Sequence, residues 1–338
     1  MSALWTAKRL LLTLLGCAGA VLVVGCVCFL VGSTGVGWPH AGLWRIRLEP
    51  VMDSALIGFA LAMAGVAYQA VLRNPLADPY LLGVSSGASL TAYIWRLPAL
   101  AVLASARWGG ISQQGMAFAG ALAAVILVLG VAGRRGRLEP VTLLLTGVIV
   151  NAVNGSVFLL INSIVRDMPV AGGTLTFLVG GIQDVTANQR MCAAVIIAVC
   201  ALVLLVISGQ LNVAMFDDGE AESLGVRIHR VRWIAIIAAS LATAAAVAIS
   251  GPIGFIGLIC PHAARAVVGS DQRRLVPIAA SAGAILLMLA DAATRLLAAE
   301  NLLATKLPVG VLTGLLGGPF FLWLLLRGSS LGKPLRDS

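Results

Sequence analysis

The stretch RNPLADPYLLGVSSGA, residues 73–88, separates two long apolar runs of this chain. It is polar where it starts, bounded by Pro75 and Pro79, and rich in glycine and serine where it ends. Proline and glycine mark turns and interrupt regular helix. The segment therefore predicts a short loop between two helical spans, and the composition around it indicates which solvent those helices meet.

The composition is that of a membrane protein. Hydrophobic residues make up 59% of the 338 positions and charged residues only 11%, and the mean hydropathy is +0.99. A water-soluble chain of this length could not bury so much apolar surface, whereas a lipid bilayer accepts it. We expect residues 1–338 to form a single transmembrane domain, with no separate soluble domain.

Ten apolar runs are candidates for membrane-spanning helices, each of which needs about 20 mostly apolar residues. They predict an all-α, polytopic bundle of about ten helices. The third and eighth runs are short and rich in glycine or proline, so we expect them to be half-buried or broken. The runs are 10–32, 52–72, 81–97, 115–133, 141–165, 191–208, 231–250, 254–269, 275–298 and 309–327.

The basic residues set the orientation of the bundle. With the N-terminus inside the cell, about twice as many arginines and lysines fall in inner loops and tails as in outer loops, which favours an N-in, C-in topology. The outer-loop group includes Arg45 and Arg47. The net charge of +9 then reflects basic residues beside anionic lipid. Nucleic-acid binding is excluded, because no basic stripe with interleaved aromatic residues is present.

The longest inner loop, 209–230, contains the acidic stretch DDGEAESLG at 217–225. An aspartate at its start can cap a short helix, acidic residues favour the first turn, and a glycine can end it. Such a helix could dock a soluble partner, or it could be a solvated loop helix without one, and the residues alone favour neither reading. The candidate docking residues are Asp217, Asp218, Glu220, Ser223, Leu224 and Gly225.

The segment 83–87 fits the G-x-S-x-G pattern of a hydrolase nucleophile. That pattern needs a strand before the serine and both Asp and His partners, whereas here a proline-bounded loop precedes it. An integral-membrane enzyme that uses Ser85 and His262 is one alternative function, and it predicts turnover by the isolated chain. Close helix packing explains the small residues better.

The segment SGPIGFIGLICPH, residues 250–262, places two prolines and three glycines in a hydrophobic context. Irregular backbone at membrane depth must line a cavity or be buried in protein, because its freed amides need partners. We therefore assign structural roles to Pro252 and Pro261. We interpret His262 as a packing or capping residue rather than a ligand or proton relay.

Asp291 is the one acidic residue in the middle of an apolar span, and Arg295 follows at the i+4 position. An intramembrane carboxylate usually faces a bundle interior or a pore, and the i+4 spacing places the two side chains on one helix face. The pattern favours a paired structural element. A proton-coupled secondary transporter that depends on Asp291 is the alternative.

No residue pattern for a metal centre or a nucleotide site is present. The six cysteines form no CxxC pair, so a metal or disulfide framework is not expected, and no cofactor is assigned. The three lysines lie in no G-x-x-x-x-G-K-[ST] sequence. If transport is driven by ATP, a separate subunit must therefore supply the ATPase.

Taken together, several segments between Arg47 and Arg327 resemble the permeases of the iron-chelate/cobalamin family of type II ABC importers. The most specific segment is 73–88. The other matching parts are 58–65 with Gln69, 223–226, 251–262 with Arg265, 269–273, Asp291 with Arg295, 307–310 and 318–321.

The resemblance implies a homodimer or pseudo-dimer with one translocation path at its interface, two cytoplasmic ATPase subunits that use ATP and Mg²⁺, and an extracytoplasmic substrate-binding protein. The chain would be no enzyme. It would import a metal chelate across the bacterial inner membrane by alternating access. The loop 209–230 resembles the family's coupling loop, and Asn74 and Leu76 match its cytoplasmic gate. Arg47 and Arg295 match arginines that pair with acidic residues of the binding protein.

Three departures from the family pattern fall on the outer face. Pro50 stands where a second arginine is usual, Lys306 replaces a usual glutamate, and the loop 298–305 is longer than usual. The cargo stays open among ferric siderophore, haem, corrinoid and oxyanion. His40 and Tyr93 are the candidate haem ligands of an outer vestibule.

Overall fold

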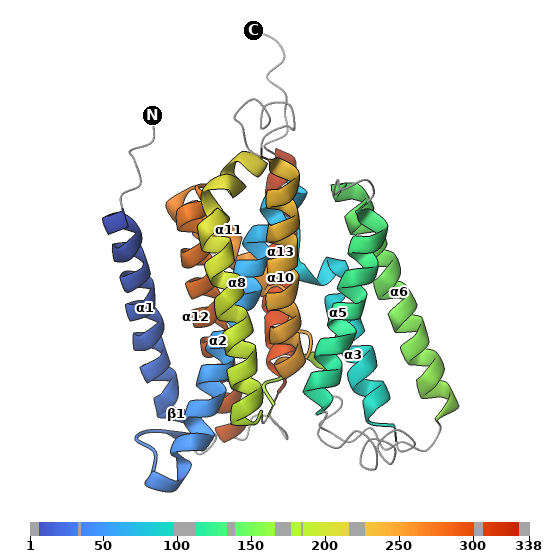
Figure 1. The fold of residues 1–338 in the computed structure, drawn as a ribbon. Coiled ribbons are helices and arrows are strands. Elements are labelled where there is room, and N and C mark those ends of the chain that lie inside the picture. The colour runs from blue at the N-terminus through green and yellow to red at the C-terminus, as the bar shows by residue number, and fades with distance from the viewer. Residues whose placement is uncertain are drawn as a thin grey trace.

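The structure is a computed structural model that describes residues 7–32, 35–97, 112–133, 139–165, 177–183, 185–215, 227–300 and 307–330. Within these ranges the chain is almost entirely helical (Figure 1). The α-helices are α1 (Ala7–Leu30), α2 (Trp44–Leu72), α3 (Val84–Trp95), α5 (Gln113–Ala132), α6 (Pro140–Ile164), α8 (Ala187–Ala214), α10 (Ile228–Ser250), α11 (Ile256–Val268), α12 (Gln272–Ala299) and α13 (Val309–Ser330). Two 3-10 turns, η1 (Ala41–Leu43) and η2 (Pro79–Leu82), and an antiparallel ribbon of β1 (Val31–Gly32) and β2 (Gly35–Val36) complete the described elements.

Each predicted apolar run overlaps one of these helices, which confirms the all-α bundle. In the described part of the chain, seven helices are long and apolar enough to cross a membrane. The third and eighth predicted runs are short, as expected, because α3 has 12 residues and α11 has 13. Neither reaches the length of about 20 residues that a complete span needs.

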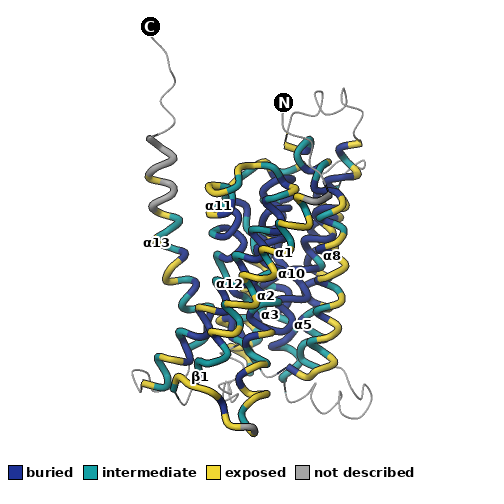
Figure 2. Tube along the Cα trace, turned by 90° about the vertical axis from the view of Figure 1, so that its left-hand side faces the viewer, coloured by how far each residue is buried: buried dark blue, intermediate teal, exposed yellow. Residues whose placement is uncertain are grey.

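The centre of the bundle is formed by α2, α10 and α12. In their most apolar stretches 83%, 78% and 72% of the residues are buried, against none in α1. Figure 2 shows this difference as a dark interior surrounded by exposed outer faces. The helices α3, α5 and α6 lie on the side of the bundle away from α1 (Figure 1), and both α3 and α5 pack against α10. The central helices are rich in alanine and glycine, and small residues let helix backbones approach closely in lipid.

The helices α2 and α12 approach each other closely. A Cβ atom at Gly58 would overlap the carbonyl group of Gly283, and a Cβ atom at Gly283 would overlap the carbonyl oxygen of Gly58. Gly65 meets Gly257 of α11 in the same way. These positions accept only glycine, since the atom that a side chain would displace belongs to a neighbouring backbone.

The ends of the described chain lie on one side of the bundle. The start of α1, the end of α13, the end of α8 and the start of α10 all lie at the top of Figure 1, and the β ribbon lies at the bottom. This arrangement agrees with an even number of crossings. We refer to these two ends as the terminal end and the ribbon end of the bundle.

Two predicted loop boundaries were wrong. Arg45, Arg47 and Pro50 lie on α2, which begins at Trp44 rather than at residue 52. Residues 209–214 continue α8 and 228–230 begin α10, so only part of 209–230 connects them. Both errors have one cause: hydropathy detects where the apolar residues stop, whereas a helix continues through polar turns that find partners outside the lipid.

Candidate functional site

Three parts of the chain meet in the interior: residues 180–183, the irregular segment 251–255 after α10, and the start of α13. Backbone hydrogen bonds join them. The N–H of Gly181 donates to Ser250 O at 2.9 Å, and the N–H of Gly310 donates to Gly180 O at 2.7 Å. Gly180 and Gly251 have φ angles of 85° and 70°, which non-glycine residues rarely adopt. The segment after α10 is thus buried in protein, one of the two outcomes that its prolines and glycines predict.

The turn at 74–77 follows directly from the end of α2. Asn74 Oδ1 accepts a hydrogen bond from the N–H of Leu76 at 2.9 Å, and Asn74 O accepts one from the N–H of Ala77 at 3.1 Å. This is an Asx turn, which asparagine favours because its side chain imitates a backbone carbonyl. The structure therefore brings the two predicted gate residues into one hydrogen-bonded unit.

The rest of this loop is tied to two other parts of the bundle. The Tyr80 hydroxyl accepts from the N–H of Ile253 at 2.5 Å, and the Asn151 side chain of α6 donates to Tyr80 O at 3.1 Å. Asp78 accepts from the N–H groups of Tyr80, at 3.0 Å, and Phe255. The loop after α2 is consequently the junction between α6 and the interrupted segment after α10.

Asp78 is an acid held in a poorly solvated position between α2 and α3. Burial raises the pKa of its carboxyl from 3.8 to about 6, and the two backbone N–H donors offset part of that rise because they stabilise the charged form. Asp78 is not among the site residues that the sequence analysis predicts.

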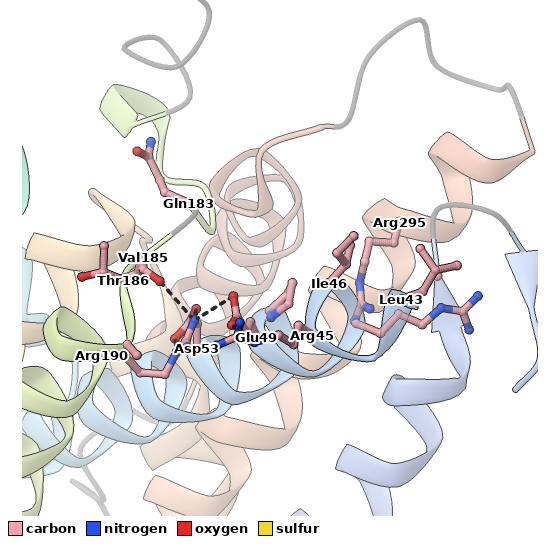
Figure 3. A pocket seen from close by; sticks show the side chains of 14 residues that line it. Leu43, Arg45, Ile46, Glu49, Asp53, Gln183, Val185, Thr186, Arg190 and Arg295 are labelled. Carbon is pink, nitrogen blue, oxygen red and sulfur yellow. Dashed lines mark hydrogen bonds and ion pairs between the residues drawn. The ribbon is translucent and has the colours of Figure 1, made fainter. Parts of the chain in front are cut away.

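A pocket of about 610 Å³ opens at the ribbon end, where α2 and α8 begin. Its charged lining consists of four arginines and two acids: Arg45, Arg47, Arg190, Arg295, Glu49 and Asp53. Figure 3 shows Arg190, Asp53 and Glu49 pointing toward one another on one side of the pocket, with Arg295 on the other. The excess of guanidinium groups makes this pocket a candidate site for binding a carboxylate.

Arg190 and Asp53 form a bidentate ion pair between α8 and α2. The distances are 2.5 Å for Nε to Oδ1 and 3.0 Å for Nη2 to Oδ2, and the Asp53 side chain is 2% exposed. Arg190 also lies 3.6 Å from Glu49. Sequence reasoning missed this pair, although an acid at the start of an apolar run was a usable signal.

Arg47 and Arg295 are mostly buried at the pocket and hold the ribbon in place. Arg47 Nη1 donates to Leu30 O at 3.0 Å and to Gly37 O at 2.7 Å. Arg295 Nη1 donates to Val31 O at 2.7 Å, and its Nε lies 2.9 Å from Asp291 Oδ2. The predicted docking arginines therefore line one pocket, and each already has a contact within the chain.

The remaining predicted residues lie apart from the pocket. His262 is half-buried in α11 with its ring edge-on to Phe320 at 5.9 Å, Pro261 lies inside α11, and Pro252 lies in the irregular segment before it. Ser85 is preceded by the 3-10 turn η2 rather than a strand, so a nucleophile elbow has no support at this position. Asp217, Asp218, Glu220, Ser223, Leu224, Gly225, Lys306 and residues 301–305 lie outside the described residues.

The candidate haem ligands differ in their surroundings. The Tyr93 hydroxyl donates to Asn162 Oδ1 at 3.0 Å, and its ring packs against Phe158 at 4.7 Å, with 4% of the residue exposed. His40 is exposed before η1. Tyr93 thus serves packing between α3 and α6 in this structure.

Comparison with known proteins gives a consistent result. A model of the FecCD transport family matches residues 37–327. The chain is 39% identical to the cobalamin import system permease protein BtuC of Halobacterium salinarum, over 83% of this chain and 72% of that protein. It is 38% identical to the hemin transport system permease protein HmuU of Yersinia pestis, over 84% of this chain and 83% of that protein. It is 35% identical to the Fe(3+) dicitrate transport system permease protein FecD of Escherichia coli, over 84% and 85% respectively.

A solved structure agrees with the sequence relatives. A chain described as a metal-chelate type ABC transporter in an inward-facing conformation superimposes with a TM-score of 0.79 at 25% identity, and the match covers 94% of this chain and 99% of that chain. The chain therefore shares its overall fold with a transport protein. On this evidence the chain, a multi-pass membrane protein, belongs to the FecCD transport family.

Proposed function

We propose that this chain is the permease subunit of an ATP-driven importer that carries a metal chelate into the cytoplasm across a bacterial inner membrane. The observation that carries the proposal is the family match over residues 37–327. The relatives above are named for cobalamin, hemin and ferric dicitrate, all of which are metal chelates. The cargo class for this chain is accordingly a ferric siderophore, haem or a corrinoid.

Transport proceeds by alternating access at the interface between two copies of the chain. The terminal end of the bundle faces the cytoplasm and receives two ATPase subunits, which bind ATP and Mg²⁺. The connection between α8 and α10 contacts them, and the turn at 74–77 forms the cytoplasmic gate. The Asx turn supports this role, because its hydrogen bond joins Asn74 and Leu76 into one local unit.

The ribbon end receives a substrate-binding protein. Its acidic side chains meet the arginines of the pocket, since a guanidinium presents a planar and always charged fork to a carboxylate. Arg295 supports this assignment: its Nη2 is buried without a hydrogen-bond partner, and a buried donor in this condition is stabilised by an incoming acceptor.

The principal alternative is a proton-coupled transporter that uses Asp291. Asp291 is fully buried and lies against Arg295 in an ion pair. A carboxylate that cycles through a protonated state would leave that arginine uncompensated in the interior, which is costly. The pairing therefore favours a structural role for Asp291 over a proton-carrying one.

The test is uptake into liposomes that contain this chain and its partner ATPase, with the cognate binding protein and labelled haem, ferric siderophore or cobalamin added in turn. Uptake of one cargo that requires ATP and all three proteins is expected. Uptake by the chain alone under a proton gradient, abolished by Asp291→Asn, would replace this proposal with the alternative.

The coupling assignment has a separate test. Reversing the charges of Asp217 and Glu220 together is expected to separate ATP hydrolysis from uptake, because the acidic stretch would no longer fit the ATPase. Unchanged uptake by this double variant would remove the assignment.

A further inference from the structure

Arg73 occupies a backbone conformation that does not suit arginine. It is the C-cap of α2, with φ 50° and ψ 33°, in the left-handed region where glycine and asparagine are favoured. Among the described residues only Arg73 and Phe255 are non-glycine residues with positive φ. Strain of this kind persists where the surrounding structure fixes the residue, and it clusters at functional positions.

The Arg73 side chain reaches the end of another helix. Its Nε donates to Ala214 O at 3.3 Å, and Ala214 is the last residue of α8. The last carbonyl groups of a helix have no partner within the helix, and they form the negative end of its dipole. A guanidinium is suited to this position, so Arg73 joins the end of α2 to the end of α8.

The backbone of Arg73 leads directly into the turn at 74–77. The N–H groups of Arg73 and Asn74 both donate to Gln69 O, and Asn74 in turn organises the turn through Leu76 and Ala77. No residue separates the arginine from the turn. The residue whose side chain bonds Ala214 is therefore joined to Asn74 by a single peptide unit.

The end of α8 has a second attachment, to α12. Asn212 Nδ2 donates to Asp271 Oδ1 at 2.8 Å, and Asn212 Oδ1 accepts from the N–H of Gln272 at 2.8 Å. These paired contacts hold the end of α8 to the start of α12. Arg73 then connects this two-helix unit to the turn.

We infer that Arg73 is a positioning residue that couples the end of α8 to the turn at 74–77. This rests on the proposed function, in which the connection after α8 contacts the ATPase and the turn is the gate. When the end of α8 shifts, its hydrogen bond moves the Arg73 side chain, and the turn follows. Without the bond, the ATPase would cycle while the turn lags behind.

The first test compares three variants in the full complex in liposomes. Arg73→Gly removes the side chain and suits the left-handed backbone, so the protein should fold at least as well as the original. Arg73→Lys retains a cationic donor. Arg9→Ala is the matched control, because Arg9 is an exposed arginine at the terminal end, on α1.

The readout is ATP hydrolysed per molecule of cargo imported. Arg73→Gly is expected to raise this ratio by about fivefold or more, the lower range of coupling between two sites. Arg73→Lys should restore most of the coupling, and Arg9→Ala should leave it unchanged. An unaltered ratio in Arg73→Gly, including a parallel loss of hydrolysis and uptake, would overturn the inference.

A second measurement needs no ATPase and separates this inference from the proposed function. In the detergent-solubilised chain, amide hydrogen exchange at Leu76 and Ala77 should be faster in Arg73→Gly than in Arg73→Lys or Arg9→Ala. Equal exchange in all three would overturn the structural link, even if transport depends on ATP. A wild-type complex that imports without its ATPase would instead contradict the proposed function.

Discussion

The phenolic oxygen of Tyr80 accepts a hydrogen bond from the backbone N–H of Ile253 at 2.5 Å, although the two residues lie 173 positions apart in the sequence. The bond joins the loop after α2 to the irregular segment after α10. Ile253 lies where the helix is broken, so its N–H has no partner within a helix. The Tyr80 side chain supplies the missing hydrogen-bond acceptor from a different part of the bundle.

Tyr80→Phe is expected to destabilise the protein by about 1–3 kcal/mol, because it leaves the Ile253 N–H unsatisfied in the interior. The measurement is thermal unfolding in detergent. Tyr68→Phe is the matched control: Tyr68 bonds the Ser240 hydroxyl at 2.7 Å, and that hydroxyl can turn to a carbonyl of its own helix instead. An equal loss in both variants would contradict the assignment of Tyr80.

Arg295→Ala is expected to cost about 3–5 kcal/mol, since it leaves the Asp291 carboxylate buried without its cation. The double variant Arg295→Ala, Asp291→Ala should be more stable than the single one, because the uncompensated charge is gone. Arg45→Ala serves as the control, with an expected effect of about 0–1 kcal/mol, because the Arg45 side chain is 87% exposed. If the free-energy changes of Arg295→Ala and Asp291→Ala, each measured alone, add up to that of the double variant, the pair does not interact.

Gly58→Ala is expected to destabilise the bundle by about 1–3 kcal/mol or more, because the new methyl group would overlap the backbone of Gly283. Gly130→Ala is the control, since a Cβ atom there meets nothing within 4 Å. That change should be neutral or stabilising in α5. Unfolding temperatures of both variants in one detergent give the comparison, and a tolerated alanine at 58 would mean that α2 and α12 can separate.

The stability of the protein should depend on pH through Asp78. Its pKa rises from 3.8 to about 6 on folding, so the folded state binds the proton more tightly. This contribution to stability is fully present below pH 3.8 and is lost as the pH rises through about 6. Relative to Asp78→Asn, the unfolding temperature should fall across that window. A constant difference between the two proteins would exclude the effect.

Hydropathy was sufficient to predict where the helices lie, because a bilayer selects apolar runs of a certain length whatever their partners. Even the shortness of α3 and α11 could be predicted, since proline and glycine act locally. The start of α2 at Trp44 could not be predicted from hydropathy. The first turns of α2 are polar, and Arg47 in them bonds Leu30 O and Gly37 O, which lie in another part of the chain.

The long-range contacts of the candidate site were beyond the reach of the sequence. Asp291 and Arg295 could be paired because they are one helical turn apart. Arg190 and Asp53 could not, because nothing local relates two residues on different helices, and the same holds for Arg73 and Ala214. The resemblance to a permease family indicated which loops matter, but not which side chains join them.

The backbone contact between Gly310 and Gly180 has a consequence for biogenesis. The Gly180 carbonyl receives its hydrogen bond from a residue at the start of α13, so that bond forms only after nearly the whole chain has been synthesised. Until then the junction of residues 180–183, the segment 251–255 and the start of α13 is incomplete in a membrane that offers no water. A chain that terminates before residue 310 should therefore insert into the membrane but leave the Gly180 carbonyl without its hydrogen bond. Membrane quality-control proteases should degrade such an incompletely folded chain.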